Sequence, residues 1–184
     1  AKNLVGLCER IMPFPPGHYY ADGKFVRYAD LTTVTEYSKD DLDTVCKKIR
    51  EKLIAGVEKR LDADAPLGFL LSGGLDSSLL SSLANQDMQE QGRELHTFSV
   101  DYRDNDRYFQ KSHFQPTSDP TYIRAMERYL GCRHHWTVLD TPALAEALYA
   151  AVDARDLPGM VDVDSSLLLF CREIRQDVTV ALSG

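Results

Sequence analysis

Residues 67–78 read Leu-Gly-Phe-Leu-Leu-Ser-Gly-Gly-Leu-Asp-Ser-Ser. The first five residues form a short apolar run, which is typical of a buried strand when turn residues follow it. Gly73 and Gly74 permit a sharp turn, and a helical pattern of apolar residues runs from Ser77 to about Gln91. This segment therefore predicts a strand, a glycine turn and a helix in direct succession.

The same alternation of strands and helices continues through the rest of the chain. Besides the strand at residues 67–71, strands are expected at residues 94–100, 134–139 and 178–182. Further helices are expected from a cap at Ser38 to about Arg60, from a cap at Asp119 to Gly131, from Thr141 onward, and from a cap at Asp164 through Arg175. Residues 101–118 and 155–162 are expected to form loops. Four strands alternating with helices predict an α/β fold whose parallel sheet has helices on both faces.

A short arm is expected before this α/β region. Residues 13–17 read Pro-Phe-Pro-Pro-Gly, which is stiff and extended, and residues 19–26 predict a β-hairpin that turns at Asp22 and Gly23. Residues 1–37 are therefore interpreted as a connector with a hairpin arm. Residues 38–184 are interpreted as the main domain.

Composition excludes several broad classes of protein. The net charge of -7 disfavours a broad nucleic-acid interface, which clustered Lys and Arg side chains would provide. No apolar run approaches the roughly 20 residues that cross a bilayer, and the first residues do not resemble a signal peptide. The four cysteines are scattered singly, so we expect reduced thiols rather than a zinc site or disulfides. A cytoplasmic protein that binds neither nucleic acid nor membrane is expected.

The glycine turn has the composition of an anion-binding site. Ser72, Ser77 and Ser78 supply hydroxyl groups, and the free backbone amides at a helix start point toward the same place. Asp76 would repel a phosphate, but it fits a site in which its carboxylate holds Mg²⁺ against phosphate oxygens. No Gly-x-x-x-x-Gly-Lys-Ser/Thr motif occurs, so a Walker A loop is excluded. A serine-capped helix after a tight turn is the purely structural alternative.

Residues 72–78 in this context resemble the PP-loop of the ATP pyrophosphatases, whose fold is the adenine nucleotide alpha hydrolase-like type. The segments at residues 13–19, 97–100 and 181–184 are also similar to asparagine synthetases, in the same order along the chain. The resemblance implies that ATP and Mg²⁺ are bound, with Asp76 on the metal and Val100 meeting adenine through its backbone. The residues implied around the nucleotide phosphates are Leu71, Ser72, Gly73, Gly74, Leu75, Asp76, Ser77 and Ser78, with Ser183 and Gly184 approaching from the neighbouring strand.

This resemblance also implies a reaction and partners. Aspartate would be adenylated on its side-chain carboxylate with release of pyrophosphate, and ammonia derived from glutamine would then displace AMP. A glutaminase domain is expected at the amino-terminal side of the full-length chain, with residues 1–37 as its connector, and a homodimer is an expected assembly. The acidic segment expected after Gly184 is missing, so residues 38–184 are interpreted as a truncated synthetase domain. No residue is assigned as catalytic, and this chain alone is expected to be inactive.

Several alternatives remain open at this stage. A related amide-forming ligase, such as a β-lactam synthetase-like enzyme, would share the nucleotide loop, and a nucleotide-binding module without catalysis is also compatible. Arg155, Asp156, Asp162 and Asp164 are placed either at the mouth of the site or in a solvated loop, with Asp164 as a helix cap. His134 and His135 are interpreted as structural, because adjacent strand residues face opposite sides.

Overall fold

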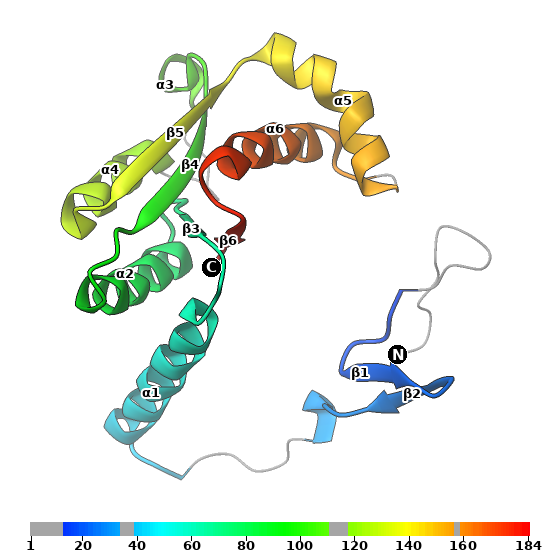
Figure 1. Cartoon of the computed structure of the whole chain (residues 1–184), viewed down its shortest axis with the longest axis vertical. Helices are drawn as coiled ribbons and strands as arrows, with labels where there is room; N and C mark the ends of the chain where they lie inside the picture. Colours follow the sequence, from blue (N-terminus) through cyan, green and yellow to red (C-terminus); the bar gives the residue numbers. More distant parts are fainter. Residues whose placement is uncertain (1–12, 34–38, 111–117, 157–158) are drawn as a thin grey trace. The chain divides into compact units, whose positions relative to one another are not determined.

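The computed structural model describes residues 13–33, 39–110, 118–156 and 159–184 (Figure 1). The chain divides into two compact units, residues 1–48 and residues 49–184. None of the described helices is long and apolar enough to cross a lipid bilayer.

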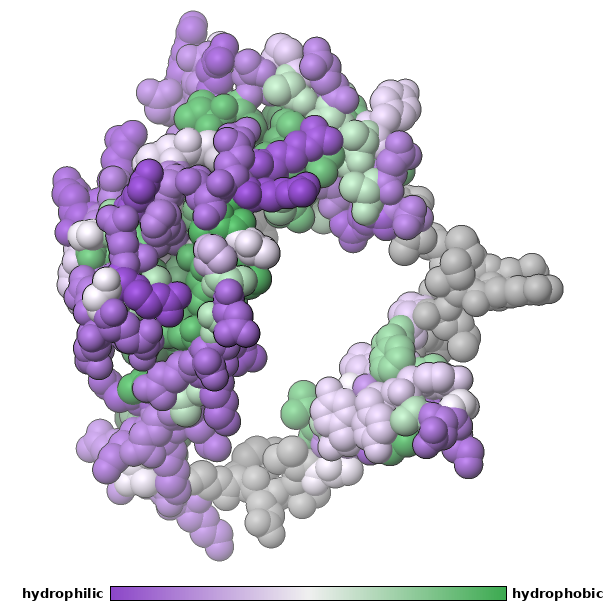
Figure 2. Space-filling view, in the orientation of Figure 1, coloured by the Kyte–Doolittle hydropathy of each residue, from purple (hydrophilic) through white to green (hydrophobic). Residues whose placement is uncertain are grey.

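The first unit contains the predicted hairpin. Strands β1 (His18–Ala21) and β2 (Lys24–Arg27) pair in antiparallel fashion, with Tyr20 opposite Phe25. Asp22 and Gly23 both have positive φ angles, 51° and 75°, as a two-residue hairpin turn of this kind requires. A short 3-10 helix, η1 (Leu31–Thr33), follows. The hairpin prediction is confirmed, and Figure 2 shows apolar and aromatic residues at the surface of this unit.

The second unit is built on a parallel four-stranded sheet. Its strands are β3 (Leu67–Leu70), β4 (His96–Tyr102), β5 (Arg133–Leu139) and β6 (Val180–Leu182). They lie in the order β5-β4-β3-β6, and each neighbouring pair is parallel. All four predicted strands are confirmed, with ends that shift by one or two residues.

Helices cover both faces of this sheet. Within the described residues, the α-helices are α1 (Leu42–Leu61), α2 (Leu75–Glu90), α3 (Asn105–Tyr108), α4 (Asp119–Leu130), α5 (Thr141–Arg155) and α6 (Val161–Asp177). Leu67 and Phe69 of β3 pack in one buried cluster with residues of α1, α2 and α4, whereas Phe98 of β4 packs in a second cluster with Phe170 and Ile174 of α6. Because successive strand residues face opposite sides, these clusters lie on opposite faces (Figure 1). The predicted fold class is confirmed.

Three predicted helix starts are wrong. Helix α1 begins at Leu42, because the Asp41 carboxylate accepts a hydrogen bond from the Thr44 backbone N–H at 2.8 Å; Ser38 itself lies outside the described residues. This hydrogen bond also lowers the pKa of Asp41. Helix α4 has Ser118 as its cap position and Asp119 as its first residue.

The third correction concerns Asp164. Helix α6 begins at Val161, so Asp164 lies inside its first turn and is not the cap. Its carboxylate instead accepts a hydrogen bond from Arg155 Nη1 at 2.6 Å, which joins the end of α5 to the start of α6. The expected loop at residues 101–118 also contains the short helix α3, while residues 111–117 lie outside the described residues.

Candidate functional site

The order of the strands places a crevice beside β3. The chain passes outward from β3 to β4 and β5, then returns through α5 and α6 to β6, on the other side of β3. The strand order therefore reverses at β3, and the carboxyl ends of β3 and β6 lie side by side. Open parallel sheets bind ligands at such a reversal, outside the carboxyl ends of the strands. The residues at this point are 71–74 after β3 and Ser183 and Gly184 after β6.

The glycine turn is held in a shape that only glycine tolerates at one position. Gly73 has a φ of +78°, which side chains rarely adopt, and a Cβ atom there would lie 3.0 Å from Tyr122 Cβ and 3.1 Å from the Asp119 carbonyl oxygen. Gly74 has an ordinary φ of -75° and stands at the cap position of α2. Gly73 thus allows the turn to pack closely against the first turns of α4.

Two serine hydroxyls fix the rest of the loop. The Ser72 backbone N–H donates to Ser77 Oγ at 3.2 Å, and the two hydroxyl oxygens lie 3.0 Å apart. The Ser77 hydroxyl donates to the Gly74 carbonyl at 3.3 Å, and the Gly74 N–H donates to Ser72 Oγ at 3.4 Å. Ser77 is buried. The hydroxyls that the sequence suggested as ligand donors therefore also bond to the loop itself.

Leu71 joins this loop to the neighbouring strand. Its N–H donates to the Phe98 carbonyl at 2.8 Å, and its own carbonyl accepts a hydrogen bond from the Ser99 hydroxyl. Ser99 is buried, with 3% of its surface exposed. The sequence did not predict an individual role for Ser99. The alternation of residues along the strand indicates burial, but it does not reveal a hydrogen bond to the loop.

A cavity of about 250 Å³ opens among these groups. Six predicted site residues line it, namely Leu71, Ser72, Ser77, Val100, Ser183 and Gly184. The other lining residues are Leu70, Phe98, Ser99, Asp119, Ile123 and Phe170. Asp119 was interpreted only as a helix cap, and no signal in the sequence placed it beside the glycine turn. We call this space the loop cavity.

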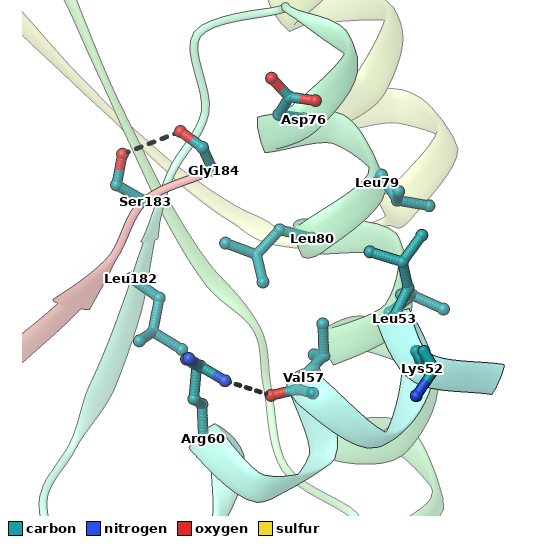
Figure 3. A pocket seen from close by; sticks show the side chains of 12 residues that line it. Lys52, Leu53, Val57, Arg60, Asp76, Leu79, Leu80, Leu182, Ser183 and Gly184 are labelled. Atoms are coloured by element: carbon teal, nitrogen blue, oxygen red, sulfur yellow. Dashed lines mark hydrogen bonds between the residues drawn. The ribbon is translucent and has the colours of Figure 1, made fainter. Parts of the chain in front are cut away.

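A second cavity, of about 350 Å³, is also lined by Ser183 and Gly184 (Figure 3). Asp76 lines this cavity together with leucine side chains of α1 and α2 and the cationic side chains of Lys52 and Arg60. The two cavities are close neighbours, because both contain Ser183 and Gly184 and because a Cβ atom on Gly184 would lie 2.6 Å from the Asp76 carbonyl carbon. Asp76 is exposed at the second position of α2.

The remaining predicted site residues are backbone or flanking positions. Gly73, Gly74, Leu75 and Ser78 line neither of these two cavities, and Gly74 and Leu75 form the start of α2. Among the described residues, no group of three or more His, Cys, Asp or Glu side chains is arranged to hold a metal ion.

Arg155 at the end of α5 and Asp164 in the first turn of α6 do not line the loop cavity. Arg155 and Asp164 pair with each other and line a separate cavity between α5 and α6. Ser166 contacts the hydroxyl of Tyr102 at 2.8 Å, which joins α6 to the end of β4. His134 lies on β5, where Nδ1 is 2.7 Å from Thr97 Oγ1 and burial lowers the pKa of its imidazole.

Comparison with known proteins identifies the family. A sequence model described as asparagine synthase matches residues 48–184. The chain belongs to the asparagine synthase family. The family match includes every residue of both cavities and both strand ends that meet at the crevice.

Individual asparagine synthetases resemble the chain over nearly its whole length. Asparagine synthetase [glutamine-hydrolyzing] 3 of Bacillus subtilis is 40% identical over 98% of this chain and 30% of its own length. Asparagine synthetase [glutamine-hydrolyzing] 3 of Arabidopsis thaliana is 32% identical over 100% of this chain and 31% of its own length. The chain therefore spans about a third of the length of these relatives.

Two solved structures are partly similar to this chain. NAD+ synthetase from Burkholderia pseudomallei matches 73% of this chain and 60% of its own chain, with 16% identity and a TM-score of 0.43. A predicted subunit of tRNA methyltransferase from Methanocaldococcus jannaschii matches 64% of this chain and 51% of its own, with 16% identity and a TM-score of 0.37.

Proposed function

We propose that this chain is the ATP-using part of an asparagine synthetase and that the loop cavity holds the nucleotide. The observation that carries the proposal is the meeting of Leu71, Ser72 and Ser77 with Ser183 and Gly184 around one cavity in a member of this family. The cavity lies at the carboxyl ends of parallel strands, where nucleotides bind in open α/β sheets.

The loop offers the phosphates a set of backbone donors. The first amides of an α-helix have no partner within the helix, and those of α2 follow directly after the Gly73-Gly74 turn. The helix dipole adds partial positive charge at the same end. Ser72 and Ser77 hold the turn in place through their hydroxyls, so these amides require little reorganisation when phosphate arrives. Val100 lines the cavity from β4 and would meet the adenine through its backbone.

Asp76 fits the role of a magnesium ligand. Its carboxylate oxygens are the hard donors that Mg²⁺ prefers, and one or two carboxylates with phosphate oxygens and water commonly suffice for this ion. Asp76 directly precedes Ser77, which lines the loop cavity, and a Cβ atom on Gly184 would lie 2.6 Å from the Asp76 carbonyl carbon. When bound, Mg²⁺ would neutralise charge on the phosphates and on departing pyrophosphate.

The proposed reaction activates a poor electrophile. The side-chain carboxylate of aspartate attacks the α-phosphorus of ATP, the bond to the β-phosphate oxygen breaks, and pyrophosphate leaves. Ammonia then attacks the acyl carbon and displaces AMP, which gives asparagine after loss of a proton. The loop and the α2 amides would align and stabilise the leaving phosphates.

The ammonia source and the wider assembly are also proposals. We propose that glutamine is hydrolysed on an amino-terminal domain of a longer polypeptide and that residues 1–37 belong to its connection. The names of the relatives, which state glutamine hydrolysis, support this assignment. Magnesium, aspartate as acceptor, a homodimer and a cytoplasmic location belong to the same proposal.

Titration of the chain with Mg·ATP and Mg·GTP in a calorimeter tests the nucleotide site. We expect saturable, ATP-selective binding that Asp76→Ala weakens, whereas Asp87→Ala, a matched aspartate further along α2, leaves it unchanged. Equal affinity for both nucleotides, or equal effects of the two substitutions, would contradict the assignment of the loop cavity or of Asp76.

The reaction requires a test in the longer protein. A full-length polypeptide that contains this chain should release pyrophosphate only when aspartate is present, and should release AMP only when ammonia or glutamine is present as well. AMP formation with another carboxylate in place of aspartate would indicate a β-lactam synthetase-like ligase. ATP binding without AMP formation from any carboxylate would indicate a nucleotide-binding module.

A further inference from the structure

Two histidines lie side by side at the amino-terminal ends of β4 and β5, at the opposite end of the sheet from the loop cavity. His96 Nδ1 and His135 Nε2 are 3.3 Å apart, within hydrogen-bond distance. Their ring planes differ by 22° and their centroids lie 5.3 Å apart. His135 also stacks on Phe98, with centroids 4.5 Å apart, so both imidazoles lie on the α6 face of the sheet.

A carboxylate faces the outer nitrogen of each ring. Glu94 Oε2 lies 3.6 Å from His96 Nε2, and Asp177 Oδ2 lies 3.5 Å from His135 Nδ1. The four side chains thus form a row, Glu94, His96, His135 and Asp177, from the start of β4 to the last residue of α6. Arg133, on the same strand as His135, is the remaining charged group that acts on its imidazole.

Counting hydrogen atoms shows which charge state this row favours. Two neutral imidazoles carry two N–H groups, and one of these must lie between the rings to form their hydrogen bond. Only one N–H then remains for the two outer nitrogens, so one carboxylate faces a bare lone pair. One additional proton supplies an N–H to both carboxylates and retains the bond between the rings. A second additional proton places two N–H groups against each other.

We propose that His96 and His135 form a binding site for a single shared proton, which couples β4 and β5 to the end of α6. With one additional proton, both imidazole–carboxylate contacts and the contact between the two rings are favourable. With no additional proton or with two, one of these three contacts is repulsive. Such a pair titrates as a unit in two separate steps, unlike an isolated histidine.

The site controls the junction between α6 and β6. Asp177 ends α6, and Val178 directly after it is buried, with its Cγ2 atom 2.8 Å from the position of a Cβ on Gly68. The N–H groups of Thr179 and Val180 then donate to the Pro66 carbonyl as the chain enters β6. In the one-proton state, the His135 Nδ1–H faces Asp177 and so holds this junction against β5. This inference is independent of the nucleotide assignment.

Burial lowers the pKa of His135, with the neighbouring charges of His96 and Arg133 acting in the same direction and Asp177 opposing them. The folded state therefore resists protonation of His135, while the unfolded chain accepts this proton near the ordinary value of 6.5. Because the unfolded chain binds this proton more readily, the free energy of unfolding is highest above pH 6.5. It decreases as the pH falls below 6.5 toward the lowered pKa of His135.

Imidazole NMR titration of the whole chain provides the first test. We expect the His135 signals to move in two steps, and His96→Gln to convert the His135 curve to one step. His18→Gln, a histidine of the hairpin unit, serves as the control and should leave the His135 curve unchanged. Single, independent steps in the unmodified chain would overturn the proposal.

Hydrogen exchange at residues 178–180 provides a second test that does not depend on removing a histidine. Asp177→Asn keeps the size of the side chain but removes the charge that holds protonated His135. We expect faster exchange of these amides at the pH where the pair holds one proton, and little change at a pH where both imidazoles are neutral. Equal exchange in both proteins at both pH values would refute the coupling to α6.

Discussion

Gly73→Ala perturbs the turn between β3 and α2 with a single methyl group. The φ of +78° costs an alanine roughly 1 to 2 kcal/mol relative to glycine, because Cβ then crowds the following carbonyl. The methyl group would also lie 3.0 Å from Tyr122 Cβ and 3.1 Å from the Asp119 carbonyl oxygen. Overpacking of this kind costs about 1 to 3 kcal/mol, depending on how far α4 moves. We therefore expect a loss of about 2 to 5 kcal/mol in the free energy of unfolding.

Two further glycines separate these contributions. Gly92 has a φ of +68° and nothing within 4 Å of its Cβ position, so Gly92→Ala should show the backbone cost alone. Gly74 has a φ of -75° and only the Ser72 hydroxyl near its Cβ position, at 3.4 Å, so Gly74→Ala should be the mildest of the three.

Urea denaturation of the three variants measures the free energies, and calorimetry with Mg·ATP reports on the loop itself. The expected order of destabilisation is Gly73→Ala, then Gly92→Ala, then Gly74→Ala. ATP affinity should fall about tenfold or more in Gly73→Ala alone, which corresponds to about 1.4 kcal/mol. Equal losses for Gly73 and Gly74, or an unchanged affinity in Gly73→Ala, would refute the argument that the left-handed turn shapes the site.

Three other substitutions have expected outcomes. Ser99→Ala removes the hydroxyl that bonds to the buried Leu71 carbonyl, so we expect a loss of about 1 to 3 kcal/mol in urea denaturation; a neutral result would mean that the carbonyl finds another donor. Phe69→Ala empties a fully buried position and should cost about 3 to 5 kcal/mol by the same assay, unless the core collapses around the gap. Asp140→Ala removes the acceptor of the Ala143 N–H at the start of α5, and a thermal melt should show a loss of about 1 kcal/mol, against no loss for Asp140→Asn.

Local sequence patterns were sufficient to predict most of the fold. The apolar run before Gly73, the alternation around Phe98 and the Gly131 helix end each depend on backbone and solvent preferences that act over a few residues. The errors concern helix starts, where several acidic and hydroxyl residues compete as caps. Asp164 is a good cap by type, but the arginine at the end of α5 forms an ion pair with it, and the helix begins three residues earlier.

The candidate site was predictable only in part, because its members come from distant segments. The glycine turn was predictable from its composition, and Ser183 and Gly184 were predicted from the family resemblance. Asp119 and Ser99 gave no comparable signal, since their proximity to the turn depends on how α4 and β4 pack beside β3. The placement of Asp76 in the adjoining cavity likewise depends on the position of Gly184 against α2.

The pairing of β3 with β6 determines when this crevice can exist. Leu67 lies opposite Val180, so the contact joins two segments separated by two other strands and five helices in the chain. Closing such a long loop costs entropy before any native contact compensates, and distant strand pairs therefore tend to form late in folding. The βαβ units β3-α2-β4 and β4-α4-β5 can assemble beforehand, when the crevice has not yet formed. Acquisition of ligand binding during refolding would thus report the final step of sheet assembly, and it would lag behind the recovery of helical structure.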